Sequence, residues 1–409
     1  MEYQYHTFAN GLRLLHIASP QQVSHVGVFI NVGSRHELAN EKGMAHFVEH
    51  TLFKGTSHRK AFHIMNRLES VGGDMNAYTS KEETCIYASF LNQYYARALE
   101  LFADILFNAN FPPKEIEKEK QVVLDEIDSY KDTPAEQIMD DFEELSFPNH
   151  PLGSGILGKP NHIRKFDQAR VLSFIKRNYA PSQMLVSSVG NIDFEKLKKQ
   201  VEKYFGGYSN SPYAPILPGL QPTYGSFHIE KKTRNFQTHC VIGGQAPEMS
   251  SPKRAVMALL NNITGGPSMT SRLGLSIRER HGYTYNIESG YNAYTDSGLM
   301  YIYFGTDAQY YSKVLDLVYL ELNKLCTQAL GTSQLHMAKQ QFLGQFAIAS
   351  ESNSARMMAY GKQLLLVSSI DTPEEIYQII QRITSKELLE AANQVFSTNN
   401  LQTIVFKSR

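Results

Sequence analysis

Apolar positions recur along the chain with two periods, one typical of strands and one typical of helices. Alternating or continuous apolar runs predict strands, and these cover residues 12–17, 25–31, 85–91, 184–189, 239–243, 283–289, 299–304 and 403–406. Apolar residues spaced three or four apart predict helices, and these cover residues 43–54, 62–70, 93–108, 113–131, 167–178, 194–204, 252–263, 309–325, 333–360 and 385–396. This mixture predicts an α+β fold in which a mainly antiparallel sheet with helices on one face is formed twice.

A proline-rich stretch divides the chain into two halves of similar size. Residues 206–225 contain four prolines among small and polar residues, which is the composition of an extended linker. We predict an N-terminal domain over residues 1–210, a linker over 211–225 and a C-terminal domain over 226–409. The tetrapeptide Asn-Ala-Tyr-Thr at 76–79 recurs at 292–295, and each copy leads into a strand-like run. This repetition indicates that the two domains are homologous.

Composition and charge narrow the possible partners and the compartment. The 409 residues exceed the size of one compact core, and basic and acidic residues balance at 40 each, so no basic surface for nucleic acid is indicated. Three cysteines far apart in the sequence favour a reducing compartment over a disulfide framework. The N-terminus has no apolar signal region, and no apolar run is long enough to cross a membrane. We therefore expect a cytoplasmic protein that binds neither nucleic acid nor membrane.

The most informative motif is His-Phe-Val-Glu-His at residues 46–50. On a helix, His46, Glu49 and His50 share one face. Both imidazoles can then bind one metal ion at about 2.0–2.1 Å, while Glu49 acts on a water molecule without binding the metal. This H-x-x-E-H order is a zinc-protease signature that reverses the commoner H-E-x-x-H. The alternative interpretation is a surface helix with an ordinary polar face.

A catalytic zinc ion takes three protein ligands and leaves one position open. The acidic helix predicted over residues 113–131 offers Glu119 and Glu126, which are seven residues apart and therefore share a face. Spacing alone makes Glu126 only a candidate, because charge-rich helices are usually solvated surface helices.

The whole chain resembles the insulinase–pitrilysin–mitochondrial processing peptidase family of zinc metallopeptidases, in its short two-domain bacterial form. The matching segments are the H-x-x-E-H at 46–50, the acidic helix, Gly-Asn-Ile-Asp-Phe at 190–194 and Arg-Glu-Arg-His-Gly-Tyr-Thr-Tyr at 278–285. One departure is Tyr283, which stands where leucine is common. The resemblance implies that His46, His50 and Glu126 hold one Zn²⁺ per chain and that Glu119 supports them from behind.

The resemblance also implies roles for residues outside the metal site. Arg278 and Tyr285 would approach the substrate carbonyl from the second domain and stabilise its oxyanion. Asn76 and Ala77 would begin an edge segment that binds the substrate peptide as an added strand. Glu49 would be the general base.

We therefore expect a zinc-dependent endopeptidase or oligopeptidase that hydrolyses unfolded peptides inside a closed chamber. Each chain would supply one half of a clamshell, and two identical chains would form the dimer. One alternative is the catalytic subunit of a heterodimeric processing peptidase with a zinc-free homologous partner. The other is a non-catalytic structural homologue, although such proteins tend to lose the zinc residues that this chain keeps.

Overall fold

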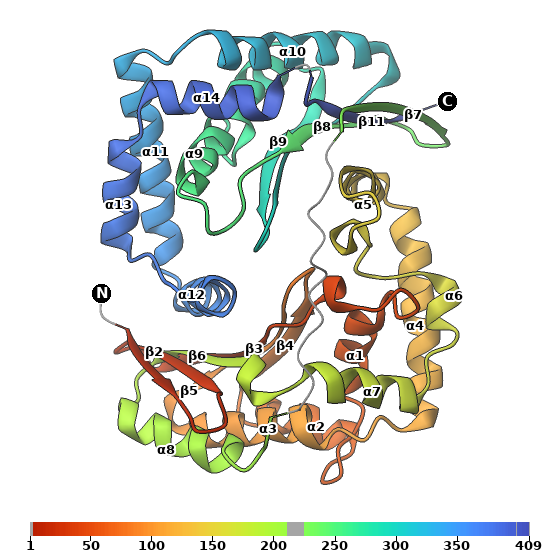
Figure 1. Cartoon of the computed structure of the whole chain (residues 1–409), viewed down its shortest axis with the longest axis vertical. Coiled ribbons are helices and arrows are strands. Elements are labelled where there is room, and N and C mark those ends of the chain that lie inside the picture. Colours follow the sequence, from red (N-terminus) through yellow and green to blue (C-terminus); the bar gives the residue numbers. More distant parts are fainter. Residues whose placement is uncertain (1–2, 211–224, 398, 409) are drawn as a thin grey trace. The chain divides into compact units, whose positions relative to one another are not determined.

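The computed structural model describes residues 3–210, 225–397 and 399–408, which form two compact units. Unit 1 comprises Met1–Asp128, Ser154–Gly219 and Ala349–Ile370, and unit 2 comprises Ser129–Gly153, Leu220–Ile348 and Asp371–Arg409, as far as these residues are described. Each unit contains one sheet and its helices (Figure 1). Two short segments therefore belong to the unit formed mainly by the other half of the sequence. Residues 129–153 of the N-terminal half are part of unit 2, and residues 349–370 of the C-terminal half are part of unit 1. The predicted linker over 211–225 lies outside the described residues except for Gly225.

The sheet of unit 1 has six strands. They are β1 (Gln4–Thr7), β2 (Arg13–Ala18), β3 (Val23–Ile30), β4 (Asp74–Thr79), β5 (Thr84–Leu91) and β6 (Met184–Gly190). Their order is β1-β2-β6-β3-β5-β4, and all neighbours are antiparallel except the parallel pair β2 and β6. Strand β4 therefore lies at one edge of the sheet.

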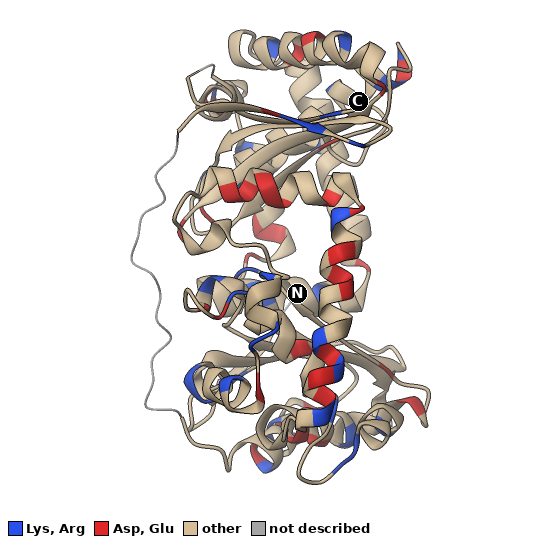
Figure 2. Cartoon of the chain, turned by 90° about the vertical axis from the view of Figure 1, so that its right-hand side faces the viewer, with Lys and Arg blue, Asp and Glu red and all other residues tan. Residues whose placement is uncertain are grey.

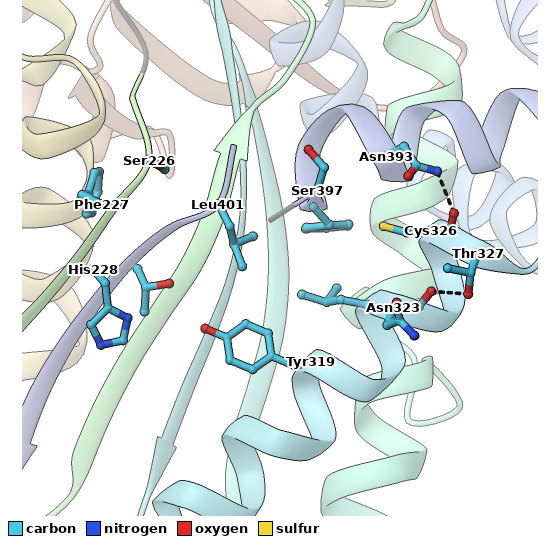
Figure 3. Close-up of a pocket in the computed structure, with 13 residues that line it drawn as sticks. Ser226, Phe227, His228, Tyr319, Asn323, Cys326, Thr327, Asn393, Ser397 and Leu401 are labelled. Atoms are coloured by element: carbon cyan, nitrogen blue, oxygen red, sulfur yellow. Dashed lines mark hydrogen bonds between the residues drawn. The ribbon is translucent and has the colours of Figure 1, made fainter. Parts of the chain in front are cut away.

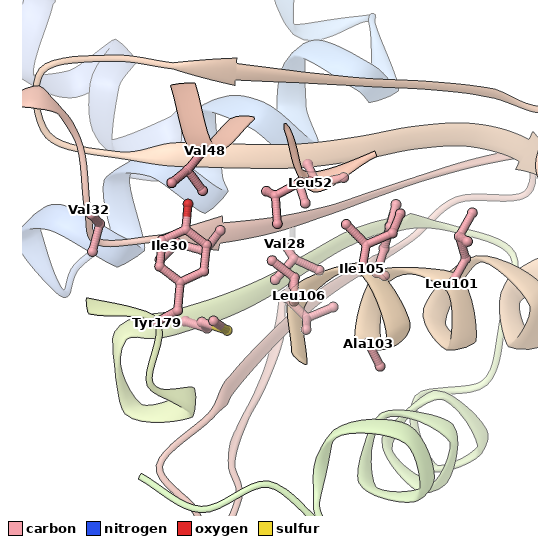
Figure 4. Packing of buried hydrophobic residues seen from close by; sticks show 14 of the residues in the cluster. Val28, Ile30, Val32, Val48, Leu52, Leu101, Ala103, Ile105, Leu106 and Tyr179 are labelled. Atoms are coloured by element: carbon pink, nitrogen blue, oxygen red, sulfur yellow. The ribbon is translucent and has the colours of Figure 1, made fainter. Parts of the chain in front are cut away.

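Helices cover both faces of this sheet. Unit 1 holds α1 (Met44–Leu52), α2 (Ala61–Glu69), α3 (Tyr95–Asn108), α4 (Pro113–Lys131, in this unit as far as Asp128), α6 (Pro160–Ile163), α7 (Gln168–Asn178), α8 (Phe194–Phe205) and α12 (Asn353–Val367). Because side chains alternate along a strand, Val28 and Ile30 of β3 join Val48 of α1 and Leu106 of α3 in one core (Figure 4). Phe29 points to the opposite face, where it belongs to a second cluster with residues of α12.

Helix α12 comes from the C-terminal half of the sequence and closes the second face of the unit 1 sheet (Figure 1). The approach is close because glycine stands at the contact: a Cβ at Gly361 would lie 2.3 Å from a ring carbon of Phe29. The hydroxyl of Ser187 on β6 donates a hydrogen bond to the backbone carbonyl of Met357 at 2.8 Å. The C-terminal half thus completes the core of unit 1.

Unit 2 repeats the same strand arrangement. Its strands are β7 (Phe227–Thr233), β8 (Thr238–Gln245), β9 (Thr284–Ala293), β10 (Gly298–Thr306) and β11 (Gln402–Ser408). The order β7-β11-β8-β10-β9, with β7 and β11 parallel, matches β2-β6-β3-β5-β4 of unit 1. The two Asn-Ala-Tyr-Thr copies accordingly fall on or beside equivalent edge strands, β4 and β9, which supports the predicted homology.

The unit 2 sheet is also covered on both faces. One face packs against α9 (Arg254–Gly265), α10 (Tyr311–Thr327), α11 (Thr332–Ser350, in this unit as far as Ile348), α13 (Pro373–Arg382) and α14 (Ser385–Phe396). The other face packs against α5 (Pro134–Ser146), which comes from the N-terminal half of the sequence. Ile138 and Phe142 of α5 lie in a cluster with Val241 of β8 and Ile404 of β11.

The α+β class with two mainly antiparallel sheets is confirmed, with corrections to single elements. The helix predicted over 333–360 is wrong: α11 ends at Ser350 and α12 begins at Asn353, and the Ser352 side chain accepts a hydrogen bond from the Ala355 N–H as the new N-cap. The prediction that helices cover only one face of each sheet was also wrong. Helix α12 covers the second face of the unit 1 sheet, and α5 covers the second face of the unit 2 sheet. The sequence pattern did not predict α5, α6, α13, β1, β4 or β7.

Candidate metal centre and active site

The helix that carries the H-x-x-E-H motif is fixed at its N-terminus by a buried carboxylate. Helix α1 begins after Gly43, whose φ of 97° is in the left-handed region that favours glycine. The two oxygens of Glu37 accept hydrogen bonds from the N–H groups of Gly43 and Ala45, both at 2.9 Å. Burial raises the pKa of Glu37, and these two N–H groups oppose that shift. No local pattern of residues indicates this capping role.

Helices α1 and α4 bring together the three predicted metal ligands. The Nε2 atoms of His46 and His50 lie 3.7 Å and 3.5 Å from the same atom, Oε2 of Glu126. One ligand atom from each of the three residues lies within 4.8 Å of the others. Two imidazoles and one carboxylate, spaced in this way, are a typical donor set for a catalytic zinc ion.

The state of these side chains fits a bound cation. Glu126 Oε2 is inaccessible to solvent and has no hydrogen-bond partner among the described residues. A buried carboxylate oxygen without a partner is costly, and a cation between it and the two imidazoles would satisfy it. Burial and, to a lesser extent, the charge of His50 lower the pKa of His46 to about 4. His46 is therefore neutral at pH 7, as a metal ligand must be.

Glu119 lies behind the second histidine, at the place that the family resemblance implies for a supporting residue. Its Oε2 is 3.3 Å from Nδ1 of His50, the ring nitrogen that does not face Glu126. A carboxylate in this place fixes the tautomer and the orientation of a ligating imidazole. The Nδ1 atom of His46 is buried and has no such partner among the described residues. The two histidines are therefore supported differently.

Glu49 is held at the site by a hydroxyl group that the sequence analysis did not single out. Thr79 on β4 donates a hydrogen bond to Glu49 Oε2 at 2.6 Å. Burial raises the pKa of Glu49, while the Thr79 hydroxyl and His50 lower it and Glu126 raises it further. The net upward shift makes Glu49 a stronger base than an exposed glutamate.

Strand β4 has one free edge beside this site. It pairs with β5 on one side, and no other described strand pairs with it. Asn76 is exposed, and its side-chain oxygen accepts a hydrogen bond from the N–H of Ala77 at 2.8 Å. An edge strand with free backbone groups can take up an extended peptide as an added strand. Because Thr79 belongs to the same strand, this edge is directly linked to Glu49.

Arg278 and Tyr285 lie in unit 2, whereas the three candidate ligands and Glu49 lie in unit 1. Arg278 is in a short π-helical segment, Gly274–Glu279, and its Nε donates to the Glu279 carboxylate at 2.9 Å. Tyr285 is the second residue of β9, and 90 % of its surface is exposed. Their proximity to substrate stays a prediction.

Among the described residues, no other group of three His, Cys, Asp or Glu side chains lies close enough together to hold a metal ion. A hollow of about 830 Å³ in unit 2 lies between α10, α14 and the start of β7 and β11 (Figure 3). Among the described residues that line it, His228 and Cys326 are the only imidazole and thiol, and no carboxylate is present.

Acidic and basic residues are interspersed in both units (Figure 2). Within the part of the chain that the structure describes, no helix has the length and apolar character needed to span a membrane.

Comparison with known proteins identifies relatives of the chain in sequence and in fold. Residues 13–159 match the insulinase family (peptidase family M16), and residues 165–342 match the peptidase M16 inactive domain. The chain is 33 % identical over 407 residues to an uncharacterized zinc protease of Bacillus subtilis, covering 98 % of both chains. It is 32 % identical over 400 residues to an uncharacterized zinc protease of Rickettsia felis, covering 97 % of this chain and 95 % of the relative. The crystal structure of a Helicobacter pylori protease is similar in fold, with a TM-score of 0.92 at 21 % identity and 99 % coverage of both chains.

Proposed function

Because the chain belongs to the insulinase (M16) peptidase family, we propose that it is a zinc-dependent endopeptidase or oligopeptidase acting on unfolded peptides. The observation that carries the proposal is the convergence of His46, His50 and Glu126, whose buried Oε2 has no hydrogen-bond partner among the described residues. These residues would hold one Zn²⁺ per chain. A zinc ion there would polarise the scissile carbonyl group and make a water molecule more acidic.

Glu49 would carry the proton during hydrolysis. Its carboxylate would accept a proton from the attacking water and later deliver it to the leaving amine. The hydrogen bond from Thr79 leaves one carboxylate oxygen of Glu49, Oε1, available for this transfer. Glu119 would keep the imidazole of His50 in the tautomer that presents Nε2 to the metal.

The substrate peptide would lie along the free edge of β4. Backbone groups of Ala77 would pair with the peptide. The Asn76 side chain would give up its hydrogen bond with the Ala77 N–H and would bind a carbonyl or amide group of the substrate instead. Recognition through the backbone tolerates many side chains, which suits an enzyme that degrades varied peptides. Arg278 and Tyr285 would donate hydrogen bonds to the oxyanion, as the family resemblance implies.

The assembly that we propose is a homodimer in which each chain forms one half of a closed chamber. The alternative, a heterodimer with a zinc-free homologous partner, differs in what the purified chain can do. A purified chain that elutes as a dimer and cleaves peptides supports the homodimer. A zinc-loaded chain that is inactive until a homologous subunit is added supports the heterodimer, and a chain that binds no zinc supports a non-catalytic role.

The replacement Glu49→Gln tests the catalytic proposal. The amide has nearly the shape of the carboxylate but cannot accept the proton, so turnover of a mixed peptide library should fall by several orders of magnitude. Zinc content should remain at one ion per chain, because Glu49 is not a ligand in this proposal. A matched control is Glu117→Gln, since Glu117 is an exposed glutamate on α4 paired only with Lys120 among the described residues. Wild-type turnover in Glu49→Gln would remove this residue from the mechanism.

A further inference from the structure

A lysine at the end of the metal-binding helix contacts the carboxylate that supports His50. The Nζ atom of Lys54 lies 2.7 Å from Oε1 of Glu119, and the other oxygen of the same carboxylate, Oε2, lies 3.3 Å from His50 Nδ1. Lys54, Glu119 and His50 therefore form a chain that ends at the candidate metal site. We propose that Lys54 is a positioning residue for this site, which holds Glu119 in the orientation that accepts the Nδ1–H of His50. The inference rests on the proposed function only in requiring that the site binds zinc.

The burial of Glu119 explains why its orientation needs a partner on each oxygen. Its side chain is 8 % exposed, so water reaches the carboxylate poorly. With Lys54 present, one oxygen is satisfied by an ammonium group and the other by an imidazole N–H. Without Lys54, one oxygen of a nearly buried carboxylate would lose its charged partner. The carboxylate would then turn towards solvent, and His50 would lose the acceptor that fixes its ring.

The backbone that carries Lys54 is held in place by the turn between α1 and α2. The N–H of Lys54 bonds to the Thr51 carbonyl at 3.1 Å, and Gly55 forms a bridge with Lys60. Buried Asp104 on α3 then fixes the next residues, because it accepts hydrogen bonds from the Thr56 hydroxyl at 2.9 Å and from Arg59 at 2.6 Å. Lys54 is therefore presented to Glu119 from a rigid turn and is not a loose surface lysine.

Two other views of Lys54 make different predictions. If it is an ordinary surface ion pair, removing it should change nothing, because exposed pairs contribute little. If only its charge matters, removing a cation near a bound dication should tighten zinc binding. If Lys54 orients Glu119, removing Lys54 should have the opposite effect and weaken the affinity for zinc. The direction of the change therefore separates the three explanations.

The test compares Lys54→Met, Lys54→Arg and Lys118→Met by competition of the full-length protein with a fluorescent zinc chelator. Loss of a partner behind a ligating histidine typically weakens metal binding by 10–100-fold, and Lys54 acts one step further out, so we expect roughly a tenfold increase in the zinc Kd for Lys54→Met. Lys54→Arg, which keeps the charge and the donors, should stay within about threefold of wild type. Lys118→Met removes a comparable Lys–Glu pair from the exposed face of α4 and should have no effect.

The same measurement in a Glu119→Gln background completes the test. If Lys54 acts through Glu119, Lys54→Met should cause no further loss once Glu119 is replaced. A zinc affinity of Lys54→Met equal to or tighter than wild type would overturn the inference, as would an equal loss in both backgrounds. Thermal melts identify a variant that fails to fold, and Lys54→Gln, which keeps one donor, then takes the place of Lys54→Met. Absence of zinc binding by the wild-type protein would instead contradict the proposed function.

Discussion

The contact between Gly361 of α12 and Phe29 of β3 allows a sharp test of how unit 1 is completed. A Cβ added at Gly361 would lie 2.3, 2.6 and 2.8 Å from three carbons of the Phe29 ring. Ordinary contacts begin near 3.4 Å, so the helix or the ring must move by about 1 Å. Phe29 is fully buried among residues of β2, β5, β6 and α12. Gly361→Ala should therefore push α12 off the sheet.

The expected magnitude combines two opposing effects. Overpacking of a well-packed core costs about 1–3 kcal/mol, whereas replacing a helical glycine by alanine gains about 1 kcal/mol. Three contacts below 3.0 Å put the overpacking cost in the upper part of its range, so the net effect is a loss of roughly 1–2 kcal/mol of unfolding free energy. The matched control is Gly344→Ala on α11, where a Cβ would meet no atom within 4 Å. That variant should gain up to about 1 kcal/mol from helix propensity alone.

Hydrogen–deuterium exchange of peptides covering β3 and α12 measures the local effect directly. A loss of about 1–2 kcal/mol corresponds to roughly 5- to 30-fold faster exchange through opening of this region. Gly361→Ala should show this acceleration in β3 and α12, whereas Gly344→Ala should leave both segments unchanged. Protection in Gly361→Ala equal to or greater than wild type would refute the claim that α12 closes this face of the sheet.

Two further predictions concern Asp104 and Ala77. Burial raises the pKa of Asp104, but hydrogen bonds from His58, Arg59 and Thr56 outweigh it and the pKa is lowered overall. Its stabilisation is therefore present above the ordinary aspartate pKa of about 3.9 and is lost as pH falls through the folded value. In urea melts, Asp104→Asn should cost about 1–3 kcal/mol at pH 7, and its difference from wild type should shrink below pH 4; a difference independent of pH would contradict this reasoning. Ala77→Pro removes an N–H from the free edge of β4, where proline is tolerated. The KM for peptides should therefore rise severalfold, while zinc content and melting temperature stay nearly unchanged. An unaltered KM would place the peptide elsewhere.

Local patterns in the sequence predicted the two helices that carry the candidate metal ligands, but not β4, the strand that carries Thr79. The apolar positions of α1 and α4 have clear helical spacing, and the spacing of His46 and His50 on α1 fixes their shared face. The carboxylate of Glu126 could be only a candidate from spacing, because its meeting with α1 is a tertiary contact. The family resemblance supplied that assignment, and the structure places the three groups together.

The elements and contacts that local patterns miss depend on tertiary packing. Helix α5 has acidic residues along its length and resembles a solvated segment, yet Ile138 and Phe142 are buried against the unit 2 sheet. The break between α11 and α12 is marked only by the Ser352 N-cap within a run of helix-forming residues. Thr79 and Lys54 act through partners 30 and 65 residues away, and no local pattern reveals such pairs.

The most direct test of the account is to locate zinc in crystals by anomalous diffraction at the zinc absorption edge. We predict one site per chain, with the ion about 2.0–2.2 Å from Nε2 of His46, Nε2 of His50 and a carboxylate oxygen of Glu126. The signal should disappear in His50→Ala crystals grown with the same zinc concentration. Zinc-soaked wild-type crystals with no anomalous peak between α1 and α4, or with the ion bound by other residues, would contradict the central claim.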